Sequence, residues 1–309
     1  MARFARSGAD PDRSRHTFSD ESNMDQRIID LYDEFTNAPL VRRVFIKRLS
    51  VLAGSASAAM ALLPLLESNY ALAATVAIDD ARIDTGHVSY PGASGPVRAY
   101  LARPKGAAKL PAVVIIHENR GLTPYIEDVA RRTALDGFVA LAPDLLSPFG
   151  GTPADEDAGR QLFTRVKRDV AVADLVAGVA YLRQRADVAP RIGCVGFCWG
   201  GGGANELAVN APDLAAVVSF YGVQPAPADV PKIKAKLLLH YASSDDRVNA
   251  GVAAFEAALK AAGVSYTKYL YEGTQHAFHN DNAGARYNKA AAELAWGRTM
   301  EFLHAALDR

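Results

Sequence analysis

Gly196-Phe197-Cys198-Trp199-Gly200-Gly201 is the stretch that decides the fold of this chain. It follows a short apolar run, residues 191–195, and it precedes a stretch with a helical pattern. In a Gly-x-nucleophile-x-Gly turn between a strand and a helix, the flanking glycines leave the space that a strained nucleophile requires. Such a turn also directs the next backbone N–H and the helix N-terminus to the place where negative charge forms. The stretch therefore predicts Cys198 as a nucleophile at the tip of a parallel strand.

Outward from this turn, the chain alternates between strand and helix patterns, as a parallel sheet requires. The expected strands cover residues 87–90, 97–101, 111–117, 138–142, 191–195, 214–220, 236–241 and 266–271. The expected helices cover residues 126–136, 158–185, 250–262 and 283–307, with one more after the turn. The first two strands flank a Pro/Gly turn and should form an antiparallel hairpin at the sheet edge. These patterns predict an α/β fold in which helices cover both faces of a mostly parallel sheet.

The composition favours one large catalytic domain, residues 75–309. The chain has 309 residues, 50% of them hydrophobic, which is enough for a full core. The formal net charge is zero, so nothing indicates a nucleic-acid partner. A disulfide between Cys194 and Cys198 would be geometrically poor, and their spacing matches neither a redox motif nor a zinc knuckle. We expect no metal and no cofactor. The oligomeric state is open, with a monomer favoured.

Residues 1–74 have the pattern of a targeting segment outside the catalytic fold. Arg42-Arg43 precedes an uncharged stretch, residues 49–66, and Ala71-Leu72-Ala73 fits a small-x-small cleavage site. This order resembles a twin-arginine export signal and predicts a periplasmic protein. The alternative is an uncleaved anchor that faces the periplasm, which would be the protein's one contact with a membrane. Met24 opens an amphipathic helical pattern, and translation could start there.

Four reactive side chains follow four of the expected parallel strands. Glu118 follows strand 111–117, Cys198 tips the strand before the turn, Asp245 follows strand 236–241 and His276 follows strand 266–271. Ligands of open α/β sheets bind outside the carboxyl ends of the strands. We therefore expect one pocket to contain all four side chains.

His276 is the expected base, which takes the thiol proton and returns one to the leaving group. His279 competes for this role, but His276 comes first after the end of its strand. Asp245 is expected to hold the imidazole and to stabilise its charged form, with Asp246 as the rival. Either aspartate could instead cap the helix that follows.

The position of Glu118 in the sequence allows more than one interpretation. Its position directly after a strand, before Asn119-Arg120-Gly121, is where half of an oxyanion hole is built in folds with a nucleophile turn. It could be a second acid–base group beside the sulfur, or it could form an ion pair with Arg120 or be a charge at the start of a helix.

The segments at residues 117–122, 142–145, 193–201 and 273–278 resemble the dienelactone hydrolase (carboxymethylenebutenolidase) family. The likeness covers roughly residues 85–307. It implies the α/β-hydrolase fold, a small lactone or ester substrate and a Cys-Asp-His triad of Cys198, Asp245 and His276. By the same resemblance, Glu118 would shift the thiol toward thiolate when substrate enters. The backbone N–H groups of Trp199 and Asn119 would form the oxyanion hole.

The sequence departs from the family where the substrate is held. Well-known members carry one arginine in the loop after the Ala-Pro-Asp strand and another just past the histidine. Here residues 145–152 contain no arginine, position 280 is Asn280, and the next arginine is Arg286. The substrate-binding residues therefore stay unassigned. Three alternatives stay open: a carboxylesterase of different substrate range, a non-catalytic ligand-binding relative, and a redox sensor that uses Cys194 and Cys198.

Overall fold

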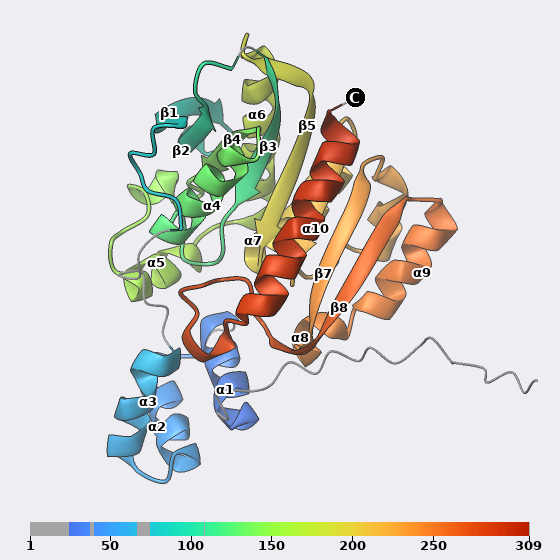
Figure 1. The fold of residues 1–309 in the computed structure, drawn as a ribbon. Coiled ribbons are helices and arrows are strands. Elements are labelled where there is room, and N and C mark those ends of the chain that lie inside the picture. Colours follow the sequence, from blue (N-terminus) through green and yellow to red (C-terminus); the bar gives the residue numbers. More distant parts are fainter. Residues whose placement is uncertain (1–24, 38–39, 67–74, 108, 309) are drawn as a thin grey trace, which may run out of the picture.

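The computed structural model describes residues 25–37, 40–66, 75–107 and 109–308. Within these residues the chain forms an eight-stranded sheet with flanking helices, and a separate group of three helices at one end (Figure 1). Residues 1–24, which include the alternative start at Met24, and the small-x-small site at residues 71–73 lie outside the described part.

The sheet has the order β1-β2-β4-β3-β5-β6-β7-β8. β1 pairs with β2, and β2 with β4, in antiparallel fashion, whereas the other neighbouring strands are parallel. The expected edge hairpin and the mostly parallel sheet are therefore confirmed. The strands are β1 Ile83–Gly92, β2 Gly95–Pro104, β3 Leu110–Ile116, β4 Val139–Pro143, β5 Val188–Phe197, β6 Ala216–Phe220, β7 Lys236–Ser244 and β8 Tyr266–Gln275.

Helices cover both faces of the sheet. α4 (Pro124–Leu135) and α10 (Lys289–Leu307) pack on one face, and α6 (Arg168–Gln184), α7 (Trp199–Asn210) and α9 (Val252–Ala262) pack on the other. This arrangement explains why the central strands β4 and β6 are buried along their whole length, since neither face meets water. Shorter helices are α5 (Glu156–Phe163) and α8 (Asp246–Asn249), with 3₁₀ turns at η1 Ser147–Phe149, η2 Pro227–Lys232 and η3 Gly284–Arg286.

Two of the expected helices needed correction. The helix expected over residues 158–185 is two helices, because a turn after Phe163 redirects the chain before α6 begins at Arg168. Backbone N–H groups of Arg165 and Val166 bond three residues back in that turn, at 2.9 and 3.1 Å. The helix expected from residue 283 begins only at Lys289. There the side chain of Asn288 accepts a hydrogen bond from the helix backbone and so caps it.

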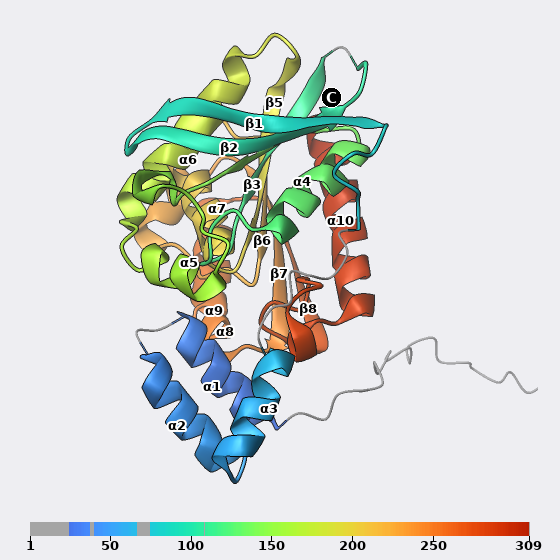
Figure 2. The ribbon, with the colours of Figure 1, turned by 90° about the vertical axis from the view of Figure 1, so that its left-hand side faces the viewer.

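The three N-terminal helices share a core of their own. α1 (Gln26–Asn37), α2 (Arg42–Leu52) and α3 (Ala56–Leu66) surround a cluster that includes Tyr32, Phe35, Phe45 and Leu63. They lie beyond the carboxyl ends of the parallel strands, close to α8 and to the loop before α10 (Figures 1 and 2). Among the described residues, no single helix passes the length and hydropathy test for a membrane span; α2 and α3 pass it only together, with a 111° bend between them.

Candidate active site

The turn between β5 and α7 holds Cys198 in a strained backbone conformation. Cys198 has φ 55° and ψ −115°, a backbone conformation that residues other than glycine rarely adopt. A Cβ on Gly196 would overlap the backbone of Gly200, and one on Gly200 would overlap the carbonyl oxygens of Ile116 and His117. Glycine is therefore required at both positions, and the sulfur is presented at the carboxyl end of β5.

His276 lies between Cys198 and Asp245. Its Nε2 atom is 3.1 Å from the sulfur, and its Nδ1 atom is 2.6 Å from Oδ2 of Asp245. His279 is directed elsewhere, with its Nδ1 atom 2.7 Å from the hydroxyl of Tyr125. The structure thus brings together the cysteine, histidine and aspartate that the strand ends indicated. It places His276, and not His279, beside the sulfur.

Asp245 combines the two roles that the sequence left as alternatives. One carboxylate oxygen accepts from His276, and the other accepts from the backbone N–H of Val248 at 3.3 Å, which caps α8. Asp246 is the exposed first residue of α8. Because both oxygens of Asp245 have fixed partners, its orientation toward the imidazole is set by the helix that follows.

Electrostatics favour a charged imidazole in this site. Burial disfavours the imidazolium form of His276, but Asp245 and Cys198 together outweigh it and raise the pKa of His276 well above its ordinary value. Burial also works against the Asp245 carboxylate, yet its interactions with His276 lower the pKa of Asp245 below the ordinary value.

Glu118 lies in the same narrow space as Cys198 and His276, together with Arg286. It is 5% exposed, and its Oε2 atom accepts from the side chain of Asn280 at 2.8 Å. Within the described part of the chain, its Oε1 atom is buried without a hydrogen-bond partner. Arg120, the alternative partner considered for Glu118, forms its ion pair with Glu156 at 2.9 Å. Asn280 therefore anchors the glutamate.

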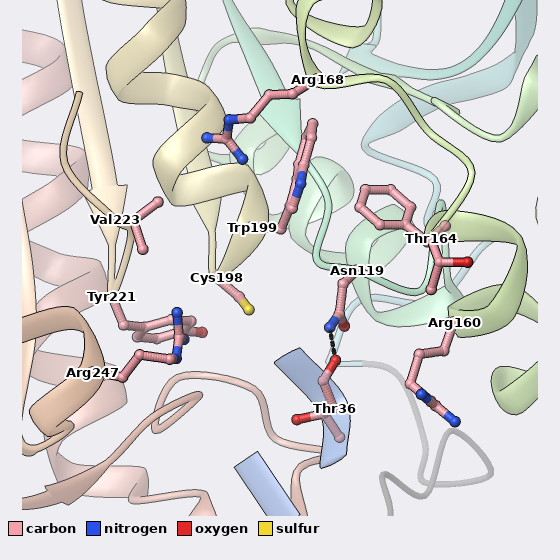
Figure 3. Close-up of a pocket in the computed structure, with 11 residues that line it drawn as sticks. Thr36, Asn119, Arg160, Thr164, Arg168, Cys198, Trp199, Tyr221, Val223 and Arg247 are labelled. Carbon is pink, nitrogen blue, oxygen red and sulfur yellow. Dashed lines mark hydrogen bonds between the residues drawn. The ribbon is translucent and has the colours of Figure 1, made fainter. Parts of the chain in front are cut away.

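A cavity of 330 Å³ opens next to the sulfur (Figure 3). Figure 3 shows Cys198 facing its centre, with Trp199 and Arg168 on one side and Tyr221 and Arg247 on another. It is lined by Thr36, Asn119, Arg160, Phe163, Thr164, Arg168, Cys198, Trp199, Tyr221, Val223 and Arg247. The two expected oxyanion donors belong to this lining. Trp199 opens α7, where the first N–H groups have no partner within a helix, and Asn119 lies just after β3.

Several lining residues were not anticipated from the sequence. Tyr221 has φ 38°, its ring lies 5.0 Å from that of His276, and burial raises the pKa of its phenol well above the ordinary value. It directly follows β6, so the rule that located Cys198 at a strand end could also have found it. Arg160 and Arg168 belong to helices beside the cavity and Thr36 to α1. No strand-end pattern points to these three.

Cys194 has no place in the site. It is fully buried in β5, both cysteines of the chain are free thiols, and burial raises the pKa of the Cys194 thiol. Among the residues that the structure describes, no three His, Cys, Asp or Glu side chains are grouped to hold a metal ion.

Comparisons with known proteins agree with this geometry. The sequence profile of the "Dienelactone hydrolase family" matches residues 97–307. A Bradyrhizobium protein named "Probable 2-oxo-3-(5-oxofuran-2-ylidene)propanoate lactonase" is 36% identical over 227 residues, which cover 69% of this chain and 91% of that protein. A Synechocystis protein named "Putative carboxymethylenebutenolidase" is 31% identical over 243 residues, which cover 73% of this chain and 98% of that protein.

The fold comparison leads to the same family. A crystal structure described as "Putative Dienelactone Hydrolase from Klebsiella pneumoniae" superimposes with a TM-score of 0.65 at 28% identity. The match covers 71% of this chain and 98% of that one. The family profile covers most of the sheet and the residues around Cys198, and the relatives and the superimposed crystal structure carry names of the same kind. The chain therefore belongs to the dienelactone hydrolase family and is a hydrolase with the α/β-hydrolase fold.

Proposed function

We propose that the protein hydrolyses lactones or small carboxylic esters through an acyl intermediate on Cys198. The observation that carries this proposal is the continuous line from Cys198 through His276 to Asp245, with distances of 3.1 and 2.6 Å. A nucleophile, a base within hydrogen-bond reach and a third group that orients the base are the parts that covalent acyl transfer needs.

In the first half-reaction the Cys198 thiolate attacks the carbonyl carbon and a C–S bond forms. The oxyanion that develops is stabilised by the backbone N–H groups of Trp199 and Asn119. Collapse of this intermediate breaks the acyl–oxygen bond, and His276 gives its Nε2 proton to the leaving oxygen. In a lactone the leaving hydroxyl remains attached to the acyl chain.

In the second half-reaction water replaces the leaving group. His276, now neutral, takes a proton from water, which attacks the thioester carbonyl. The C–S bond then breaks, the carboxylic acid leaves, and the thiolate and the imidazolium that began the reaction are restored. When no substrate is bound, His276 can return its proton to the sulfur. The atoms balance with water as the one co-substrate, so this chemistry calls for no cofactor.

The names of the relatives favour lactones over simple esters as substrates. One relative is named as a lactonase and another as a carboxymethylenebutenolidase. Residues 145–152 contain no arginine and position 280 is an asparagine, so arginines are absent from the two places where the family resemblance would put them. Instead, Arg160, Arg168 and Arg247 line the cavity from other elements. A lactone with an anionic group is therefore the first candidate, and a carboxylesterase of wider range is the second.

We further propose that Glu118 keeps the resting sulfur from being permanently ionised. Its carboxyl group lies in the same narrow space as Cys198 and accepts a hydrogen bond from Asn280, while its second oxygen has no hydrogen-bond partner among the residues that the structure describes. A negative charge close to a thiol disfavours the thiolate. A substrate that engages Glu118 would remove this restraint at the moment when the thiolate is needed.

The test is a panel of charged and uncharged lactones and aryl esters, assayed with the full chain and with Cys198→Ala. We expect turnover in the first protein and a kcat lower by about 10³-fold or more in the second. We also expect the mass of the full chain to increase by that of the acyl group during turnover of a slow ester. Cys194→Ser is the matched control, because it changes the other thiol in the same strand, and it should retain activity. Full turnover in Cys198→Ala would refute the covalent route. Binding without turnover across the panel would instead favour a non-catalytic relative.

Export to the periplasm through the Arg42-Arg43 segment is a separate proposal, which rests on the sequence pattern alone. Expressed with its own N-terminus, the protein should be recovered from the periplasm with Ala74 or Thr75 near its new end. Intact residues 42–66 on a membrane-bound protein would favour the anchor.

A further inference from the structure

Helix α1 lies between α2 and α3 on one side and the catalytic domain on the other (Figure 2), and its residue Thr36 lines the cavity beside Cys198. Tyr32 and Phe35 contribute to the core that α1 shares with α2 and α3. Ile28, Tyr32, Phe35 and Thr36 are all at most 5% exposed. A surface helix usually buries one stripe, whereas α1 is covered from two directions. The helix is therefore fixed between the two parts.

Polar contacts tie α1 to the loop that carries Glu118. The side-chain amide of Asn119 donates to the backbone carbonyl of Thr36, and Arg120 donates to the hydroxyl of Tyr32 at 3.1 Å. The carbonyls in the last turn of a helix have no partner within the helix. The side chain of Asn119 supplies a hydrogen-bond donor to the carbonyl of Thr36, so the C-terminal end of α1 is held by the residue that we assign to the oxyanion hole.

Further contacts tie α1 to the loops around the histidine. Gln26 donates to Gln275, the residue before the histidine, at 2.9 Å. Arg286 lies 3.3 Å from the carboxylate of Asp33, and its guanidinium is 4.9 Å from the centre of the Tyr32 ring. Arg286 is only 4% exposed, and a buried charge that loses its partner is strongly destabilising. The contacts with α1 are therefore part of the folded site.

Thr36 is the residue of α1 that reaches the cavity beside the sulfur. It lines both the 330 Å³ cavity and the narrow space that contains Glu118 and His276. Figure 3 shows it below Asn119, on the side of the cavity away from Trp199. The neighbouring Phe35 is held from the catalytic domain by Arg160, whose guanidinium is 4.1 Å from the ring centre. The helix segment around Thr36 is therefore held in place by the core of α1–α3 on one side and by the catalytic domain on the other.

We propose that α1 is a structural wall of the substrate site and that Thr36 determines how large a substrate group fits beside Cys198. This inference rests on the proposed function and adds to it a specificity-determining residue outside the region matched by the family profile. Packed walls do not expand freely, so an added side chain excludes a substrate group of similar volume. The proposal applies to the protein in which residues 26–66 have not been removed by cleavage.

The first experiment changes the size of the wall in both directions in the full chain. Thr36→Ala enlarges the cavity and Thr36→Leu reduces it. kcat/KM is measured for p-nitrophenyl acetate, butyrate and octanoate. We expect the octanoate-to-acetate ratio to rise in Thr36→Ala and to fall in Thr36→Leu, by about tenfold each, since one methylene in a pocket is worth roughly 10- to 200-fold.

Thr267 provides matched controls. It is an exposed threonine on β8, so Thr267→Ala and Thr267→Leu make the same chemical changes away from the cavity and should leave the ratio unchanged. Thermal unfolding of each variant shows whether it is folded. If Thr36→Leu does not fold, Thr36→Ala alone decides the proposal, because a truncation to alanine within a helix leaves helix propensity intact.

A second readout separates this inference from the proposed function. The rate at which Cys198 is alkylated is compared for iodoacetamide and for its bulkier phenyl derivative, iodoacetanilide, with the modified peptide identified by mass. This size ratio needs no turnover, so it should follow Thr36 even in a protein that hydrolyses no ester. Both Thr36 variants could hydrolyse esters while their ester ratio and their alkylation ratio stay at the parent values. That result would refute the role of Thr36 in size selection and would leave the hydrolase proposal intact.

Discussion

Replacing Asp245 by asparagine separates the two roles that this side chain combines. The two carboxylate oxygens of Asp245 serve different partners, His276 at 2.6 Å and the backbone N–H of Val248 at 3.3 Å. Asparagine has one acceptor oxygen and one amide nitrogen, so it cannot accept from both. If the oxygen stays with the helix cap, the amide faces the imidazole and imposes the wrong tautomer. In either orientation the negative charge beside the imidazolium is lost.

The geometry sets the size of the expected loss. Unit charges 2.6 Å apart interact by about 6 kcal/mol at an effective dielectric constant of about 20, before desolvation is subtracted. The side chains of His276 and Asp245 are 2% and 4% exposed, and removing one partner of such a buried pair typically costs about 3–5 kcal/mol. If the charged imidazole of the transition state loses stabilisation of this size, kcat/KM should fall by roughly 10²- to 4 × 10³-fold, at about 1.4 kcal/mol for each factor of ten.

The assay is kcat/KM for the best ester of the panel, measured with Asp245→Asn and with Asp246→Asn. Asp246 is exposed and adjacent, so its variant removes the same charge one residue away and should keep activity within about twofold of the parent. Thermal unfolding controls for loss of the helix cap, which costs at most about 2 kcal/mol. A rate for Asp245→Asn near that of the parent, or an equal fall in both variants, would show that Asp245 does not support the base.

Three more outcomes are expected. Cys198→Ala and His276→Ala should each lower kcat by about 10³-fold or more, and the double variant should be no worse than either, because nucleophile and base act as one unit; additive losses would contradict this. Glu118→Gln should make iodoacetamide react faster with Cys198 at low pH, since a charge that opposes the thiolate is gone; identical rate-against-pH profiles would leave Glu118 without a part in the chemistry. The pKa of His276 is raised above its ordinary value of 6.5, so the charged imidazole stabilises the folded protein fully below pH 6.5. This stabilisation is lost as the pH rises through the raised pKa. Melting temperatures from pH 6 to 9 should show the loss in the parent and not in His276→Gln.

The sheet and the closeness of Cys198, Asp245 and His276 were predictable from the sequence because both depend on local patterns. The central parallel strands β3 and β6 are short, mostly apolar runs. The rule that parallel strands present their carboxyl ends at one edge then brings Cys198, Asp245 and His276 together. The glycines on either side of Cys198 identified the turn, since a Cβ at Gly196 or Gly200 would overlap the backbone. The choice of His276 over His279 followed from chain order.

Pairings between distant elements were not predictable in the same way. Asn280 appeared in the sequence only as the residue that replaces an arginine, but in the structure it anchors Glu118 at 2.8 Å. Arg168 came from a region expected to be one uninterrupted helix, and its approach to the cavity follows from the turn that breaks that helix. Such contacts depend on how helices pack on the sheet, which helical periodicity does not specify.

The N-terminal segment shows most clearly where a sequence pattern has two physical meanings. Residues 42–66 are basic and then apolar, as an export signal requires, and the same order suits two short helices that bury an apolar core. The structure has Arg42 paired with Asp157 of α5, and Phe45, Leu49 and Leu63 buried against α1. A cleaved signal would leave the cavity open on the side of Thr36, whereas a retained segment would keep it walled. The substrate range of the protein therefore depends on the fate of a segment that lies before the family's catalytic domain.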